Sequence, residues 1–154
     1  MIRFTYLHRV RYRECDPMGV VYHAHYLDYF EAARTEALRA HGLAYRALEE
    51  AGVRMPVVEA TVRYHGPARY DDVLEVEAAF PEPPGVRVAV DYRVRRQGEP
   101  AVLVTGRVVL CFIDAARGRP ILAPEPVRAL FAHAEATREP VVRGDPGPTS
   151  PRER

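Results

Sequence analysis

The chain has 154 residues, 47% of them hydrophobic and 28% charged, which is the size and balance of one globular domain with its own core. Its 22 basic and 21 acidic residues leave a formal net charge of +1, which excludes the broad positive field of a protein that binds nucleic acid or anionic lipid. No apolar run approaches the ~20 residues that span a bilayer, and the first residues lack the apolar segment of a signal peptide. We therefore expect a cytoplasmic protein without membrane insertion.

Missing residue types exclude further classes of enzyme. The chain has no lysine, and its only serine is Ser150. A Schiff-base or P-loop enzyme needs a lysine, and a serine hydrolase needs a serine on an ordered scaffold. Ser150 instead falls within residues 140–154, whose four prolines and two glycines predict a disordered tail. Cys15 and Cys111 have no paired spacing, so we expect both to be reduced.

The first predicted element is a strand over residues 4–13, because apolar and polar residues alternate there. Tyr12 would lie on the same face of this strand as Phe4. The strand is expected to end at Asp16, since Asp-Pro-Met-Gly (residues 16–19) has the residue types of a tight turn.

The rest of the chain predicts a helix, a sheet and two shorter helices. Apolar residues at helical spacing predict a long helix over residues 24–41, and a short helix follows over 44–51. Four strand-like runs separated by turn sequences come next, at residues 55–64, 73–80, 86–95 and 101–113. A short helix is predicted over 124–136. Consecutive strands favour an antiparallel sheet that the long helix can cover, so we predict an α+β fold and a single domain over 1–139.

Asp16 is the first candidate for chemistry. An aspartate before Pro-x-Gly most often bonds only the amides of its own turn. The apolar Val20, Val21 and Tyr22 would return the chain to the core beside this carboxylate. Because an apolar setting destabilises the charged form of a carboxylate, it makes that group a better base or nucleophile. Asp16 is therefore a candidate reactive group by its position.

Two histidines, His23 and His25, follow the turn. They point in different directions at a helix start, and no further ligand completes a set at recognisable spacing, so we expect no metal site. The first amides of a helix lack internal partners, and such an amide near His23 could bind an oxyanion beside Asp16. Carboxylate and amide together suffice for acyl transfer. A Cys15–His23 nucleophile pair is the rival, but in an extended segment Cys15 projects to the face opposite Asp16.

The segment YRECDPMGVVYHAHYLDYFEAARTEALRAHG (residues 12–42) closely resembles the signature of the hotdog-fold acyl-CoA thioesterases of the 4-hydroxybenzoyl-CoA thioesterase type. It is nearest to the bacterial branch of that family linked with the Tol-Pal cell-envelope system. The segment PARYDDVLEV (residues 67–76) is similar to the family's second recurrent segment. The resemblance covers about residues 3–135.

This resemblance implies a hotdog fold, in which a five-stranded antiparallel sheet wraps around the long helix. It implies a homodimer or homotetramer with active sites shared between subunits, and hydrolysis of an acyl-CoA thioester to a free acid and CoA without metal or cofactor. The catalytic carboxylate falls on Asp16 and the oxyanion-binding amide on His23, with Tyr12 and the His23 side chain beside the carboxylate. Tyr12 is equally well explained as an ordinary strand aromatic.

Residues for substrate binding are expected in two places. Within the motif they are Gly19, Val20 and Tyr22. CoA phosphates need local cations, and the arginines where the family tends to hold the nucleotide are Arg87, Arg117 and Arg119. For each arginine alone, an ordinary surface position is the simpler explanation. Arg34 and Glu31 have the spacing of a helix-surface ion pair, and we assign them no chemistry.

His25 departs from the family pattern, which usually has asparagine just before the tyrosine that begins the helix body. An imidazole copies only part of an amide's hydrogen bonding, and it adds a group that titrates at about pH 6.5. We therefore expect the local geometry and the pH profile to differ at this position.

The leading hypothesis is an acyl-CoA thioesterase that uses Asp16 as nucleophile or general base. The alternative is a hotdog module that binds acyl-CoA or acyl carrier protein without turnover. A hotdog dehydratase would need a catalytic histidine spaced to reach a β-hydroxyacyl group, and the Asp-Pro-x-Gly turn does not resemble that arrangement.

Overall fold

The structure is a computed structural model that describes residues 1–136. The predicted tail over 140–154 and the end of the predicted domain lie outside the described residues. In chain order, the helices and strands are β1 (Ile2–Arg9), the short 3-10 helix η1 (Tyr12–Glu14), α1 (His25–Ala40), α2 (Tyr45–Glu50), β2 (Val53–Arg54), β3 (Val57–Tyr64), β4 (Val73–Phe80), β5 (Arg87–Arg96), β6 (Val102–Cys111), β7 (Ile113–Asp114), β8 (Arg119–Pro120) and α3 (Glu125–Ala136).

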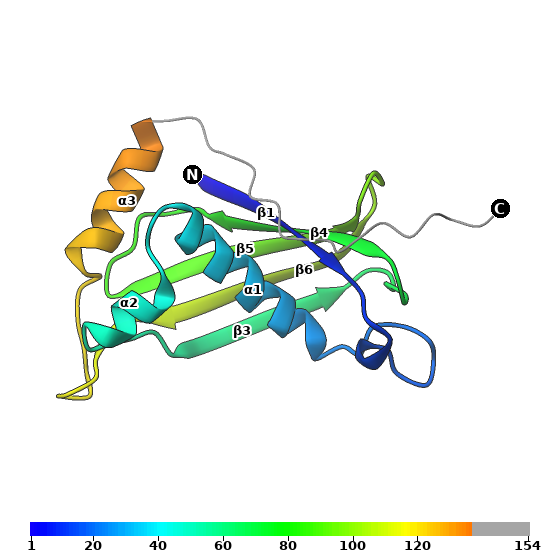
Figure 1. Cartoon of the computed structure of the whole chain (residues 1–154), viewed down its shortest axis with the longest axis horizontal. Helices are drawn as coiled ribbons and strands as arrows, with labels where there is room; N and C mark the ends of the chain where they lie inside the picture. The colour runs from blue at the N-terminus through cyan, green and yellow to red at the C-terminus, as the bar shows by residue number, and fades with distance from the viewer. Residues whose placement is uncertain (137–154) are drawn as a thin grey trace.

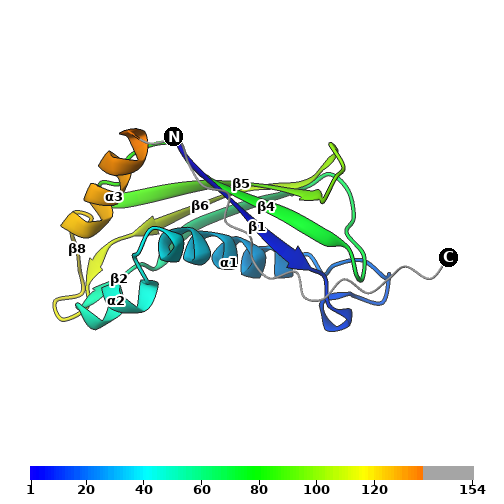
Figure 2. The same ribbon diagram turned by 45° about the horizontal axis from the view of Figure 1, so that its top comes forward.

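One antiparallel sheet and one long helix make up most of the structure (Figure 1). The sheet has the strand order β1-β4-β5-β6-β3, and every neighbouring pair is antiparallel. Helix α1 lies along one face of this sheet, as Figure 2 shows from a second direction. The predicted α+β fold with a five-stranded antiparallel sheet around a long helix is therefore confirmed.

The core lies between α1 and the sheet face that it covers. Strand β4 alternates between half-buried and buried residues, and its buried positions face the helix. In the middle of the interface, the ring of Phe30 from α1 stacks on Tyr92 of β5 with a centroid separation of 4.2 Å. A Cβ on Gly106 of β6 would collide with the Phe30 ring, so the helix can approach the sheet this closely only because residue 106 is glycine.

The first strand is shorter than the sequence predicts. Strand β1 ends at Arg9, whose partner Val73 is the first residue of β4, so the chain beyond Arg9 has no strand to pair with. Tyr12 consequently lies in the 3-10 helix η1 with 81% of its surface exposed. The prediction that Tyr12 belongs to this strand is wrong.

Two other predicted strands have different bounds in the structure: the strand predicted over 55–64 begins only at Val57, after the separate short strand β2, and the strand predicted over 101–113 is divided into β6 and β7. Pro56 stands between β2 and β3, where its missing N–H cannot extend the ladder, and Phe112 separates β6 from β7. The short strands β2, β7 and β8 form a second, three-stranded sheet that the sequence pattern did not predict. This small sheet lies beside α2, at the end of α1 away from η1 (Figure 2).

Among the described residues, strand β3 forms one edge of the main sheet, with β6 as its only neighbour. Nearly all of its residues are exposed, including the apolar Val57 and Val58. An exposed edge with apolar side chains is a surface on which a further strand can pair.

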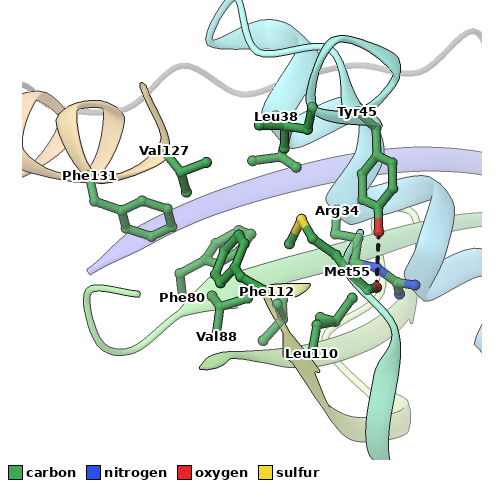
Figure 3. Close-up of a pocket in the computed structure, with 12 residues that line it drawn as sticks. Arg34, Leu38, Tyr45, Met55, Phe80, Val88, Leu110, Phe112, Val127 and Phe131 are labelled. Carbon is green, nitrogen blue, oxygen red and sulfur yellow. Dashed lines mark hydrogen bonds between the residues drawn. The ribbon is translucent and has the colours of Figure 1, made fainter. Parts of the chain in front are cut away.

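Arg34 does not lie in the surface ion pair that its spacing predicts. It lines a small cavity of about 20 Å³ between α1, α2, α3 and the sheet, whose other lining residues are mainly apolar (Figure 3). Its Nε atom is buried and has no hydrogen-bond partner among the described residues, and no ion pair joins it to Glu31 there. The prediction failed because α2 folds back over the C-terminal half of α1, so that this face of the helix is covered.

None of the helices within residues 1–136 is long and apolar enough to cross a membrane.

Candidate active site

The Asp-Pro-Met-Gly segment forms the tight turn that the sequence predicts. The amide of Gly19 donates to the carbonyl oxygen of Asp16 at 2.9 Å, and the amide of Asp16 donates to the carbonyl of Val20 at 2.9 Å. Gly19 has a φ of 78°, a left-handed conformation that suits glycine, and this pattern is a turn followed by a bulge.

Two further contacts extend this turn into a short hairpin, which we call the Asp16 hairpin (residues 14–22). Cys15 and Val21 form an isolated antiparallel bridge. At the base of the hairpin, the amide of Tyr22 donates to the carbonyl of Glu14 at 2.9 Å. Val21 is buried and its amide donates to Ala68, so the hairpin is attached to the rest of the molecule.

The carboxylate of Asp16 uses one oxygen to hold its own turn. Oδ1 accepts a hydrogen bond from the amide of Met18 at 2.9 Å, which is the local bond expected of an aspartate in this position. Oδ2 has no hydrogen bond or ion pair within residues 1–136. Oδ1 of Asp16 therefore has a structural role, and Oδ2 is available to a substrate or a water.

The segment after the hairpin leaves an amide without an internal partner. Helix α1 begins at His25, and Ala24 already has helical dihedral angles (φ −72°, ψ −23°). The amide of His23 donates to no acceptor within the described part of the chain. Its carbonyl accepts a hydrogen bond from the hydroxyl of Tyr64 at 2.8 Å. The free N–H of His23 precedes the positive end of the α1 dipole, which favours negative charge.

Two tyrosine rings lie beside the ring of His23. The ring of Tyr22 lies 4.4 Å from that of His23, and the ring of Tyr64 lies 6.3 Å from it. Tyr64 comes from the edge strand β3, 41 residues further along the chain, and no local sequence signal pointed to it. His25, which replaces the expected asparagine, has its Nδ1 3.1 Å from Oδ2 of Asp28 in the first turn of α1.

Cys15 and Tyr12 are less suited to the chemistry than Asp16. Burial, followed by the charges of Glu14 and Asp16, raises the pKa of the Cys15 thiol, which disfavours the thiolate that a nucleophile needs. Tyr12 packs edge-on against Tyr70 at 5.7 Å. No hydrogen bond or ring contact within residues 1–136 joins Tyr12 to Asp16 or His23.

The three arginines predicted for CoA binding are not near the Asp16 hairpin of their own chain. Arg87 begins β5, and Arg117 and Arg119 lie in and after the turn that joins β7 to β8. That turn and η1 are at opposite ends of α1 (Figure 1). The three side chains are exposed, and none forms an ion pair with an acidic residue of the described chain.

A pocket of about 490 Å³ lies next to the hairpin, between β1 and the first turns of α1. Its lining residues are Tyr6, His8, Arg13, Glu14, His25, Asp28, Tyr29 and Ala32. Sequence reasoning assigned no role to Glu14 or His8. Within residues 1–136, no group of three or more His, Cys, Asp and Glu side chains is arranged to hold a metal ion.

Comparison with known proteins agrees with this fold. Residues 10–131 match the family described as the Thioesterase-like superfamily. The acyl-CoA thioester hydrolase YbgC of Escherichia coli O6:H1 is 35% identical over 123 residues, which cover 80% of this chain and 91% of that protein.

Solved structures give the same result. A hypothetical protein from Thermus thermophilus has a TM-score of 0.77 and 34% identity, covering 84% of this chain and 97% of that one. A 4-hydroxybenzoyl-CoA thioesterase variant complexed with 4-hydroxybenzoyl-CoA has a TM-score of 0.73, covering 83% of this chain and 97% of that one. Its 24% identity supports the likeness of fold alone.

Proposed function

The chain belongs to the Thioesterase-like superfamily, and from this premise we propose that it hydrolyses an acyl-CoA thioester to a free carboxylic acid and CoA, with Asp16 as the reacting carboxylate. The fold is the hotdog fold, and the protein is an enzyme of the thioester hydrolase class. The choice of Asp16 and of the His23 amide is our own, and the geometry of the Asp16 hairpin supports it.

One observation supports the proposal most directly. A carboxylate oxygen without a partner and a backbone amide without a partner, Asp16 Oδ2 and His23 N–H, belong to one hairpin and its exit. Thioester hydrolysis can use both groups, because a carboxylate can attack the carbonyl or activate water, and a donor stabilises the oxygen that becomes negative.

Two routes use these groups. In the first, Asp16 Oδ2 attacks the thioester carbon, the C–S bond breaks with release of the CoA thiolate, and water then cleaves the mixed anhydride. In the second, Asp16 takes a proton from a water as that water attacks the same carbon, and the CoA thiolate leaves. In both routes the carbonyl oxygen becomes an oxyanion, for which the His23 amide is the donor.

A homodimer, alone or as half of a tetramer, is part of the proposal. The exposed edge strand β3 with Val57 and Val58 supports it. Antiparallel pairing of β3 with its copy would set the Val57 end of one protomer beside the Tyr64 end of the other. The arginines at the far end of one chain would then approach the Asp16 hairpin of its partner and could bind the CoA phosphates there.

We propose further that the reaction uses no metal or cofactor, since CoA is part of the substrate and the two groups above suffice. Activity should survive dialysis against a chelator. A cytoplasmic location is proposed with it, because CoA thioesters are intracellular metabolites, and cell fractionation tests that location.

The experiment is a free-thiol release assay with a panel of aliphatic and aromatic acyl-CoAs, on the wild type, Asp16→Asn and the control Asp91→Asn. Asp91 lies on the opposite face of the sheet, where it pairs with Arg107. We expect turnover of at least one substrate by the wild type and the control, and a large loss in Asp16→Asn. If the wild type binds acyl-CoA but turns over none of the panel, the protein is a binding module instead. If Asp16→Asn keeps the full rate, the assignment of Asp16 is wrong.

A further inference from the structure

Glu14 is the one charged side chain that is buried among the described residues, with 8% of its surface exposed. A buried carboxylate is costly unless donors satisfy it. Glu14 has two. The backbone amide of Arg11 donates to Oε1 at 2.8 Å, and Nε2 of His8 lies 2.8 Å and 3.1 Å from the two carboxylate oxygens. Because a carboxylate only accepts, the ring nitrogen of His8 is the donor in this pair.

The main chain of Glu14 forms the base of the Asp16 hairpin. Its carbonyl accepts the hydrogen bond from Tyr22, the residue directly before His23. Asp16 lies two residues after Glu14 on the other arm. The places of the reacting carboxylate and of the free amide are therefore both fixed relative to residue 14.

The partners of Glu14 attach this end of the Asp16 hairpin to both layers of the fold, the sheet and the helix. His8 belongs to β1, where it is the register partner of Leu74 in the sheet. The ring of His8 lies 4.3 Å from the ring of Tyr29, a buried residue of α1. Burial, followed by the charge of Glu14, raises the pKa of Tyr29, so that this phenol stays neutral beside the carboxylate. Glu14 thus joins the hairpin to the sheet directly and to the helix through His8.

Glu14 is not placed to react with the substrate itself. Both of its oxygens lie against His8, and its side chain lines the pocket between β1 and α1. Neither Asp16 nor His23 is among the residues that line this pocket.

We propose that Glu14, held by His8, is a positioning residue that sets Asp16 and the His23 amide at the separation that the reaction requires. The inference rests on the proposed function. A shift of about 1 Å in reacting groups can lower a rate by about 100-fold, so a loosened hairpin base would be visible in kcat.

The first arm of the test compares kcat and KM in the wild type, Glu14→Ala, Glu14→Gln and His8→Ala. We expect kcat to fall by about 100-fold in Glu14→Ala and by a similar factor in His8→Ala, with KM changed by less than about three-fold. Glu14→Gln should recover most of the rate. Its amide oxygen can accept from Arg11, and its NH₂ can donate to His8 once that ring takes its other tautomer.

The second arm repeats Glu14→Ala and Glu14→Gln in the Asp16→Asn background, with thermal unfolding recorded for every variant. If Glu14 positions both Asp16 and the His23 amide, its removal should cost the double variant clearly less than the about 100-fold that it costs the wild type, because only the contribution of the amide is left to lose, while the unfolding temperature falls equally in both backgrounds. A structural role alone would lower the rate by the same factor in both. Val127→Ala, a core residue of α3, is the control for lost stability without a displaced hairpin.

The inference is overturned if Glu14→Ala keeps kcat within three-fold of the wild type, or if its loss is equal in the two backgrounds. Should Glu14→Ala not fold, Glu14→Gln and His8→Ala decide the matter, and equal losses in both would contradict the expected recovery by glutamine. If Asp16→Asn alone is fully active, the proposed mechanism and this inference both fail. If Asp16→Asn is impaired and Glu14→Ala is not, only this inference fails.

Discussion

The two ends of helix α1 differ in how far the chain completes them by itself. At the C-terminal end, α2, α3 and the sheet enclose the helix, and only about 20 Å³ of space is left among apolar side chains (Figure 3). At the N-terminal end, the Asp16 hairpin leaves a carboxylate oxygen and a backbone amide without partners inside the described chain. Stability therefore depends on the closed end, whereas the open end keeps the polar groups that a substrate can use.

The largest expected effect on stability is at the closed end. Phe112 is fully buried against the cavity, and Phe112→Ala should lower the free energy of unfolding by about 3–5 kcal/mol, because it removes a ring from a packed core. Tyr12→Ala at the open end should cost at most about 0.5 kcal/mol, since that ring is largely exposed. Urea unfolding of both variants measures the difference. Equal losses of unfolding free energy in the two variants would contradict the view that stability depends on the closed end of α1.

High pH should weaken the packing between α1 and the sheet. Burial raises the pKa values of Tyr26 and Tyr92 to about 12, whereas both phenols ionise at about pH 10 in the unfolded chain. The folded protein binds these two protons more tightly than the unfolded chain does. The stability that they contribute is therefore fully present below about pH 10 and is lost as pH rises through about 12. Each tyrosine then contributes a loss of roughly 2 kcal/mol.

Urea unfolding between pH 8 and pH 12 would follow this loss. Tyr26→Phe and Tyr92→Phe should each make the curve of stability against pH shallower, because phenylalanine has no proton to lose. A stability that stays constant up to pH 12 in the wild type would contradict the expectation.

Gly106→Ala tests the close approach of α1 to the sheet, at Phe30 between the two ends of the helix. A methyl group there would meet the ring of Phe30, and the helix would have to move from the sheet, at a cost of about 1–3 kcal/mol. Gly85→Ala is the matched control, since a Cβ at residue 85 meets nothing within 4 Å. Thermal unfolding compares the two, and similar shifts in both would show that the Phe30 contact is not limiting.

A small effect on the rate is expected at the open end, at Tyr64. Tyr64→Phe removes the hydrogen bond to the carbonyl of His23, whose amide is the proposed oxyanion donor. We expect kcat to fall about five-fold, which corresponds to ~1 kcal/mol, the usual net value of one hydrogen bond. Tyr70→Phe, nearby and exposed, is the control. A loss shared by both variants would point to a general disturbance of the surface.

The regular elements were predictable because short-range periodicity determines them. Residues 74–78 alternate between apolar residues and glutamate, and the strand predicted over 73–80 forms with those bounds. The long helix was correct to within one residue at each end. The end of β1 was missed because it depends on where β4 begins, more than 60 residues away. The covered position of Arg34 was missed because it depends on the later fold of α2.

The site was predictable only as far as one local motif extends. Asp16, its turn and the start of α1 lie in one continuous segment, and the turn formed as expected. Glu14 looks like an ordinary charged residue in the sequence, and its burial depends on His8 in the neighbouring strand. Tyr64 reaches His23 only through tertiary packing. No hydrophobic period reports such side-chain pairs, since each depends on how separate elements pack together.

The ratio of kcat between Asp16→Asn and the wild type, on the best acyl-CoA substrate, shows most directly whether the Asp16 carboxylate reacts; unfolding temperatures are measured in parallel. We predict a loss of about 10²–10⁴-fold with an unfolding temperature close to that of the wild type, because the asparagine oxygen can still accept from Met18 while the charge is gone. A variant that folds normally and keeps kcat within three-fold of the wild type would contradict the central claim that the Asp16 carboxylate performs the reaction.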